Sequence, residues 1–285
     1  MEKKTAAPSF FGRRKEKTMT LSFPVDEFLR TAPGNRIPAS GGEWAGTPLY
    51  DAPIFGVADA CDPLFEALRA PEAVGEMHRT PAEWLPGAVR VISFFLPFSA
   101  AVRQSNREGE LPSLPWLYAR FEGQDLLLEL CRAIRSALEA EGYESVIPAL
   151  SPDFAVKPLT VTGEDGTGTL FFSSRWSERH AAFVCGLGTF GLSRGLITEK
   201  GMAGRFGSLI TTAPLDVTPR PYTDITEYCI RCGACIRRCP VHAIDENGKR
   251  NEPCSAFLDE TKRLCVPRYG CGKCQVGVPC MEKRP

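Results

Sequence analysis

The clearest helical pattern in the chain lies at residues 125–141. Apolar side chains recur there at three- and four-residue spacing, and Gly142 follows as a C-terminal cap. The residues of this apolar stripe are Leu126, Leu127, Leu130, Cys131, Ile134 and Leu138. The pattern predicts a helix whose stripe packs on the core, with Cys131 as a plain core residue.

Apolar runs predict the strands. Short runs of this kind lie at 145–150, 159–162, 195–198 and 205–212, with a glycine-rich turn at 163–168. The most strongly β-branched and aromatic run is at residues 88–96, bounded by prolines. It predicts a buried strand that ends at Pro97.

Two further stretches have the spacing of short helices. At residues 60–70, Asp62 is a candidate N-cap and Pro63 occupies the first helical position. Residues 177–185 open with a serine cap and continue with helical spacing. Loops are expected at the proline-rich residues 24–60 and 111–118, with a turn of helix as the alternative within 111–118.

The length and composition of the chain indicate about two domains. Its 285 residues exceed the ~150 residues of one typical domain. The 34 Lys+Arg and 34 Asp+Glu residues give no general attraction to nucleic acid or membrane, and the apolar run at 91–98 is too short to span a bilayer. No apolar segment follows the pair Arg13 and Arg14, as an export signal would require. A cytoplasmic protein with reduced thiols, and no membrane partner, is therefore expected.

A cysteine run is the strongest chemical signal in the chain. Residues 229–240 read C-I-R-C-G-A-C-I-R-R-C-P, the spacing by which bacterial ferredoxins hold [4Fe-4S] clusters. In such runs the first three cysteines bind one cluster and the fourth binds a second cluster, so more cysteines are expected downstream. The run supplies Cys229, Cys232, Cys235 and Cys239, and Cys254, Cys265, Cys271, Cys274 and Cys280 follow. The sequence therefore predicts two [4Fe-4S] clusters, with Cys254 and Cys265 as alternatives for one ligand.

Two other interpretations of the cysteine-rich tail fit the spacing less well. A disulfide framework requires an oxidising compartment and is typical of small secreted chains. A zinc ribbon also uses paired C-x-x-C units, but the spacing of two, two and three residues followed by proline argues against it.

A glycine-rich segment at 186–191 follows the helix predicted at 177–185. It matches G-x-G-x-x-G, but a dinucleotide site needs a strand before the glycines and a helix after them. Because the helix here precedes the glycines, the pattern favours a helix end that lets the backbone pass close to another element or to a ligand.

Four stretches together resemble epoxyqueuosine reductase and its relatives, over about residues 50–280. They are W-L-P-G-A-V-R-V-I-S-F-F-L-P-F at 84–98, S-E-R-H-A-A-F-V-C-G-L-G-T-F-G-L-S-R-G-L-I-T at 177–198, G-S-L-I-T at 207–211 and Y-G-C-G-K-C-Q at 269–275. The resemblance implies an α+β fold with a nitroreductase-like α/β core, related to reductive dehalogenases, and a C-terminal ferredoxin-like domain with two clusters. We expect an N-terminal extension at 1–45, the core at 46–220 and the cluster domain at 221–285.

The resemblance also implies cobalamin in the core, with its metal facing the nearer cluster. The corrinoid would supply the bond-breaking chemistry, while the protein supplies orientation and electrons. Candidate binding residues around the glycine segment are Arg175, Arg179, Gly186, Gly188, Gly191 and Arg194. For the three arginines, pairing with surface carboxylates is the open alternative.

The ligands of the two clusters are assigned by the ferredoxin rule and the resemblance together. The first cluster is expected to use Cys229, Cys232, Cys235 and Cys280, although Cys280 follows Cys274 after five residues where the family usually has three. In the family, one ligand of the second cluster opens a C-x-x-[YF]-L segment, which C-S-A-F-L at 254–258 matches. The second cluster is then expected to use Cys239, Cys254, Cys271 and Cys274, with Cys265 as a spare thiol.

Two departures from the family affect the expected function. Family reductases carry an aspartate, proposed as a proton donor, six residues before the glutamate that matches Glu178, and this position is Phe172 here. Epoxyqueuosine reductases often continue into a helical-repeat extension that helps to grip tRNA, whereas this chain stops at Pro285. Together with zero net charge, these departures argue against tRNA as the substrate.

Two main functions follow from the sequence. The first is a cobalamin-dependent reductase that passes electrons from an external low-potential donor, through two clusters, to an unknown small-molecule or protein substrate. The second is a non-catalytic electron-transfer or corrinoid-handling protein that serves a partner enzyme. The missing acid favours the second, whereas the retained core at 46–220 favours the first. A flavin in place of the corrinoid is a third alternative, and catalytic residues stay unassigned.

Overall fold

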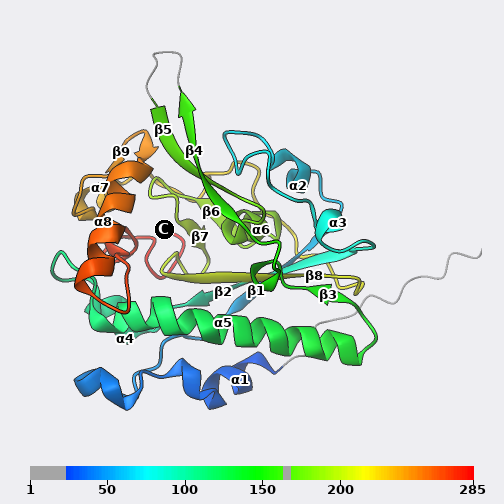
Figure 1. The fold of residues 1–285 in the computed structure, drawn as a ribbon, viewed down its shortest axis with the longest axis horizontal. Coiled ribbons are helices and arrows are strands. Elements are labelled where there is room, and N and C mark those ends of the chain that lie inside the picture. The colour runs from blue at the N-terminus through cyan, green and yellow to red at the C-terminus, as the bar shows by residue number, and fades with distance from the viewer. Residues whose placement is uncertain (1–23, 163–167) are drawn as a thin grey trace, which may run out of the picture.

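A four-stranded antiparallel sheet lies at the centre of the structure (Figure 1). The computed structural model describes residues 24–162 and 168–285. The strands follow the order β1-β2-β8-β3, where β1 is Ile54–Asp59, β2 is Arg90–Pro97, β8 is Gly204–Thr211 and β3 is Ser145–Val146. Every residue of β2 after Arg90 is buried, which confirms the buried strand predicted from the apolar run.

The two faces of the sheet carry two separate cores. Because side chains alternate across a strand, Ile92, Phe94 and Leu96 of β2 join one core and Val91 joins the other. Helix α5, Leu114–Ala140, contributes to the first core and α6, Glu178–Val184, to the second. Figure 1 shows α5 along one side of the sheet and α6 on the other. The start of α6 is thereby placed against β8.

Two hairpins lie near α6. Strand β4, Val156–Thr162, pairs with β5, Gly168–Ser174, and β6, Gly188–Phe190, pairs with β7, Leu196–Thr198. The β4–β5 hairpin projects from the core in Figure 1. It also contacts α8, Asn251–Leu264, where the side-chain amide of Asn251 donates to the carbonyl of Leu170 at 2.8 Å. The hairpin therefore connects the core to the cysteine-rich segment.

The remaining elements are short. They are α1 (Val25–Thr31), α2 (Leu64–Ala67), α3 (Pro81–Trp84), α4 (Ala100–Ser105), α7 (Ala234–Arg238), β9 (Ile244–Asp245) and β10 (Gly248–Lys249), with 3-10 turns at Pro33–Asn35, Ala39–Trp44, Pro148–Leu150 and Lys273–Gln275. Among the described residues, no helix combines the length and the apolar character needed to cross a membrane.

Several predicted loops contain regular structure. Within 111–118 the helical alternative holds from Leu114, where α5 begins, and the loop is limited to the residues before it. The hydroxyl oxygen of Ser113 accepts the N–H of Trp116 at 3.3 Å, and Pro115 lies in the first turn, where a missing N–H needs no partner. The loop expected at 24–60 contains α1 and β1, while β5 and α8 have no counterpart among the predicted elements. Residues 163–167 of the expected turn lie outside the described residues.

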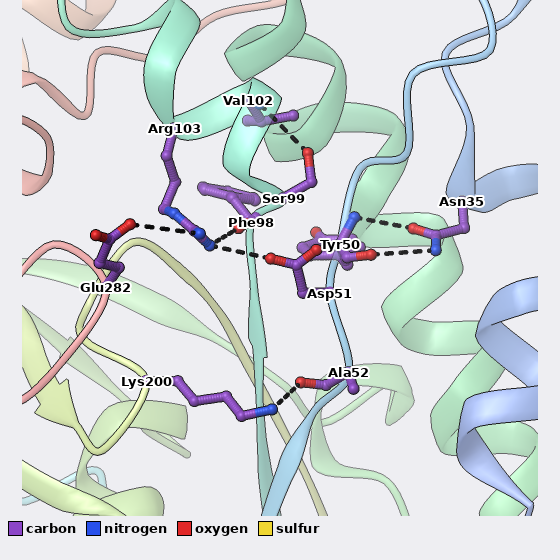
Figure 2. A network of polar contacts seen from close by, with 10 residues as sticks. All are labelled: Asn35, Tyr50, Asp51, Ala52, Phe98, Ser99, Val102, Arg103, Lys200 and Glu282. Atoms are coloured by element: carbon purple, nitrogen blue, oxygen red, sulfur yellow. Dashed lines mark hydrogen bonds and ion pairs between the residues drawn. The ribbon is translucent and has the colours of Figure 1, made fainter.

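A polar network holds the C-terminal tail against the core (Figure 2). The guanidinium group of Arg103 on α4 lies 3.2 Å from the carboxylate of Asp51 and 3.6 Å from that of Glu282, and it donates to the carbonyl of Phe98. Since Glu282 follows Cys280 by two residues, the network fixes the tail next to a candidate cluster ligand.

Candidate functional site

One group of four cysteines gathers around a small cavity near α7. The cysteines are Cys229, Cys232, Cys235 and Cys280. Gly233 precedes α7 with a φ of 68°, a left-handed conformation that favours glycine and turns the chain between the second and third cysteines. Cys280 reaches this cavity because the tail pairs with the core, where the N–H of Met202 donates to the carbonyl of Cys280 at 3.0 Å. Burial, with the nearby thiolates, raises the pKa of the Cys280 thiol to about 12.

A second group of four cysteines lines a cavity of about 190 Å³. These are Cys239, Cys254, Cys271 and Cys274. The N–H of Ala243 donates to the Sγ atom of Cys239 at 3.2 Å. Gly272, which follows Cys271, has a φ of 69°, and a Cβ atom there would lie 1.9 Å from the ring of Trp116. Only glycine fits at this position. Burial raises the pKa of the Cys274 thiol to about 12.

Each group has the donor set of a [4Fe-4S] cluster. Four thiolates around one cavity would repel one another, and iron cations would offset that repulsion. The structure brings together the same residues, in the same two groups, that the sequence assigns, while Cys265 ends α8 and lines neither cavity. Within residues 24–162 and 168–285, no three His, Cys, Asp or Glu side chains are arranged to hold a single metal ion.

A central cavity of about 550 Å³ lies between α5, α6, β8 and the β4–β5 hairpin. Apolar side chains form much of its wall, among them Leu127, Leu128 and Phe154. A neighbouring cavity of about 470 Å³ lies on the other side of Phe172, whose ring is 47% exposed and borders both spaces. The two cavities together offer a large space of mixed polar and apolar lining beside the cysteine groups.

Arg179 connects these spaces. Its side chain borders the central cavity, the neighbouring cavity and the cavity of the second cysteine group. The side chain of Arg179 is exposed to solvent within these cavities. Its guanidinium group donates to the carbonyl of Arg194 at 3.3 Å. Burial lowers the pKa of Arg179, while the thiolates of Cys274 and Cys254 raise it. Within the described part of the chain, no carboxylate forms an ion pair with Arg179, Arg194 or Arg205, so their charges are available to a ligand or a cluster.

Glu178 brings an acid to the central cavity. The hydroxyl of Ser208 on β8 donates to Oε2 of Glu178 at 2.6 Å, and the indole N–H of Trp176 donates to that hydroxyl oxygen at 2.8 Å. Burial raises the pKa of Glu178 to about 7, although the Ser208 hydrogen bond and Arg205 both lower it. Near neutral pH this carboxyl group therefore exists in both its neutral and its charged form.

The other candidate cofactor residues lie in different settings. Gly191 and Arg194 border the 470 Å³ cavity. Arg175 borders none of the four cavities described here, and its guanidinium group pairs with Asp153 at 3.8 Å. The two remaining glycines, Gly186 and Gly188, line none of these cavities either. Gly186 ends α6 with a φ of 83°, and Gly188 lies in β6 so close to β7 that a Cβ atom would lie 2.0 Å from a carbonyl oxygen.

Two histidines also lie in or beside α6: His180 is half-buried within the helix, and His78 is buried beside it. Nδ1 of His180 lies 2.7 Å from the hydroxyl of Ser177, and burial lowers the pKa of His180 to about 3. His78 is 2% exposed and stacks on Trp176 with ring centroids 5.5 Å apart, while neither of its ring nitrogens has a hydrogen-bond partner within the described residues. Burial lowers the pKa of His78 to about 4. Both rings are therefore neutral at physiological pH.

Sequence reasoning missed three residues of the central cavity and its surroundings. Arg205 and Gln124 line the cavity from β8 and α5, and Ser208 binds Glu178. A signal existed for Ser208 alone, because a hydroxyl within the buried strand G-S-L-I-T needs a hydrogen-bond partner. The other two are long polar side chains that a sequence pattern would place on the surface.

Comparisons with known proteins agree with the cysteine chemistry. A family described as 4Fe-4S binding domain (Fer4) matches residues 222–245. The chain is 30% identical over 139 residues to an epoxyqueuosine reductase of Listeria monocytogenes, covering 45% of this chain and 33% of that protein. It is 25% identical over 264 residues to that of Staphylococcus aureus, covering 83% and 62%. The chain thus spans between about a third and three fifths of the length of these curated relatives.

A solved structure shares the fold at low sequence identity. It is a catabolic reductive dehalogenase in complex with 3-bromo-4-hydroxybenzoic acid, with a TM-score of 0.51, 14% identity and coverage of 81% of this chain and 30% of that one. The resemblance to epoxyqueuosine reductases is therefore confirmed, as is a mixed helix-and-sheet fold with a ferredoxin-like region. The nitroreductase-like description of the core stays a prediction.

Proposed function

We propose that the protein is an iron–sulfur reductase related to epoxyqueuosine reductases, with two [4Fe-4S] clusters. The first cluster would be held by Cys229, Cys232, Cys235 and Cys280, and the second by Cys239, Cys254, Cys271 and Cys274. One observation carries this proposal, namely that eight thiols meet in two groups of four, each around its own cavity. Because all twelve cysteines are free thiols, the protein suits a reducing compartment, which we propose is the cytoplasm.

We further propose that the space divided by Phe172 and Arg179 holds a corrinoid and the substrate. A corrinoid, when bound, supplies a low-valent metal for reductive bond cleavage. Arg179, Arg194 and Gly191 would hold it, since they border the cavity and the two arginines lack carboxylate partners among the described residues. Apolar side chains such as Leu127 line part of the central cavity and offer an apolar surface to these molecules.

The central cavity also favours an enzyme over an accessory protein. A carrier of electrons has no need of a 550 Å³ cavity that contains a buried carboxyl group and two guanidinium groups. An external low-potential protein or small molecule would supply the electrons. We propose a small-molecule or protein substrate rather than tRNA, because Phe172 replaces the acid of the family and the chain has no excess of positive charge.

The proposal is tested by counting iron and sulfide after anaerobic reconstitution. We expect about eight of each per chain, because each [4Fe-4S] cluster has four. Cys254→Ala should leave about four iron atoms, whereas the matched variant Cys265→Ala on the same helix should keep about eight. About four iron atoms in the unmodified protein would refute the two-cluster assignment. An unchanged iron content in Cys254→Ala would remove Cys254 from the second site.

A further inference from the structure

The central cavity lacks the aspartate of the family, because the corresponding position is Phe172. Reductive cleavage of a bond leaves an electron pair on an atom of the substrate, and a nearby acid stabilises that charge by donating a proton. Within the described residues, the titratable side chains on the cavity wall are Cys131, Glu178, Arg179 and Arg205. The arginines stay cationic, and burial raises the pKa of the Cys131 thiol, so it is a weaker acid than usual. Glu178 is the remaining candidate.

We propose that Glu178 is the proton donor of the central cavity. This inference rests on the proposed reductase function and names the acid that the function needs. Glu178 opens α6, and the contacts of this helix with β2 and β8 hold it against the sheet. The carboxyl group is thus placed at the cavity by the rigid part of the fold rather than by a loop.

The hydrogen bonds around Glu178 have a defined direction. The indole N–H of Trp176 donates to the hydroxyl oxygen of Ser208, and the single O–H of Ser208 donates to Oε2 of Glu178. Within the described part of the chain, Oε1 has no protein partner, and Glu178 keeps solvent-accessible surface where it lines the cavity. The acid proton is therefore best carried on Oε1, the oxygen that remains available to a ligand.

The surroundings of Glu178 hold the pKa of its carboxyl group near neutral pH. Arg205 of β8 faces the carboxyl group, Arg179 follows it on α6, and Cys131 lies opposite on α5 as a neutral thiol. Burial raises the pKa of Glu178 to about 7, and Ser208 and Arg205 prevent a larger rise. A general acid works best when its pKa lies close to the working pH.

The proposed step is a proton transfer. The O–H bond of neutral Glu178 breaks, and the proton bonds to the substrate atom that has gained an electron pair from the external low-potential donor. The donor loses two electrons, the substrate gains them, and Glu178 is left as a carboxylate beside Arg205. A proton from solvent in the cavity then restores the acid.

An infrared titration of the reconstituted full chain tests this assignment. A neutral carboxylic acid has a C=O stretching band that a carboxylate lacks. Between about pH 5 and about pH 9, we expect one such band to disappear with a midpoint near pH 7 and to be missing from Glu178→Gln. Glu129→Gln is the matched control, because Glu129 is exposed on α5 and outside the cavity, and this variant should keep the band. A band that persists in Glu178→Gln, or no band with this midpoint, overturns the proposal.

A second variant tests the hydrogen-bond relay. Ser208→Ala removes the donor to Oε2, so the carboxylate form loses stabilisation and the midpoint of the band should move to higher pH. A residue with a merely structural role would not show this shift. A midpoint that stays in place or falls in Ser208→Ala refutes the relay.

Turnover separates this inference from the proposed function. With reduced methyl viologen as electron donor and an aryl epoxide as the probe substrate, Glu178→Gln should lower kcat on the order of 100-fold at neutral pH. Its iron content should equal that of the unmodified protein, and the loss of rate near pH 7 should vanish from its pH profile. Equal kcat values in both proteins overturn the proposal. A titrating band without turnover in the unmodified protein supports the acid and counts against the reductase function for this substrate class.

Discussion

His78 should make the protein sensitive to acid. Its ring is buried against Trp176 without hydrogen-bond partners among the described residues, so the folded state favours the neutral imidazole. The pKa of His78 is about 4 in the folded protein, against 6.5 for a histidine in an unfolded chain. Above pH 6.5 the ring is neutral in both states. As the pH falls from 6.5 toward 4, only the unfolded chain gains the proton, and stability is lost.

The size of this loss follows from the two pKa values. Between about pH 8 and about pH 5, proton binding to the unfolded state lowers the free energy of unfolding by about 2 kcal/mol. An unfolding entropy of roughly 2.1 cal/mol/K per residue over 285 residues converts this to about 3 °C in the unfolding midpoint. His78→Phe keeps an aromatic ring on Trp176 and removes the titrating group.

The assay is anaerobic thermal unfolding of the reconstituted protein at about pH 8 and about pH 5, at one heating rate. Packing changes in His78→Phe shift the midpoint equally at both pH values, so only the difference between the two shifts matters. We expect the variant to gain about 3 °C more at pH 5 than at pH 8. Equal gains at both pH values would refute the buried, neutral state of His78.

Glu178→Gln serves as a control of opposite sign. Burial raises the pKa of Glu178 from 4.5 to about 7, so its cost to stability grows as the pH rises through this window. Between about pH 5 and about pH 8 the cost increases by about 2.5 kcal/mol, or about 4 °C. The glutamine variant should therefore gain more at pH 8 than at pH 5. A gain that is larger at pH 5 would contradict the burial of a neutral acid.

Three further predictions concern the cofactors and the substrate. Equilibrium dialysis should show that the protein retains cobalamin with micromolar or tighter affinity. Arg179→Met should weaken this affinity about tenfold, which corresponds to a contribution of the guanidinium group on the order of 1.4 kcal/mol. If neither protein retains cobalamin, corrinoid binding is excluded. Gly272→Ala should lose roughly half of the iron, because residue 272 has a positive φ and the new methyl group would clash with the ring of Trp116. Gly109→Ala is the control: residue 109 also has a positive φ, but a methyl group there meets no other atom, so this variant should keep its iron. In a strain without its own epoxyqueuosine reductase, the protein should not restore queuosine in tRNA, since its 34 Lys+Arg residues are balanced by 34 Asp+Glu residues and give no general attraction to tRNA, and normal levels of the modified base would refute this substrate assignment.

Local chemistry predicts the parts of the structure that depend on neighbouring residues. The strand at 88–96 and the helix at 125–141 were both recognisable, because their apolar positions face a core directly. Helix α8 was not, because its apolar residues are few and its buried residue within the described range is Thr261. Its stability depends on contacts with β5 and the cysteine segment, which are distant in sequence.

The candidate site divides in the same way. Cysteine spacing is a local constraint, so the run at 229–239 was recognisable from the sequence, while the choice of Cys254 over Cys265 came from the resemblance to the family. Glu178 marked a family motif in the sequence, but its chemistry depends on Ser208 and Arg205 of β8, which only the fold brings beside α6. For Gly186 and Gly188 the sequence left open a close approach to another element or to a ligand, and in the structure their close contacts are with backbone.

The attachment of the C-terminal tail sets an order for biosynthesis. Cys280 reaches its three partner thiols only after the tail has paired with the loop that follows β7, where Met202 donates to its carbonyl. The ribosome releases Cys229, Cys232 and Cys235 well before Cys280, so the nascent chain presents an incomplete set of three thiols. In the proposed assignment, loading of the first cluster therefore follows the folding of the sheet and the docking of the tail, which makes cofactor insertion a check on the integrity of the core.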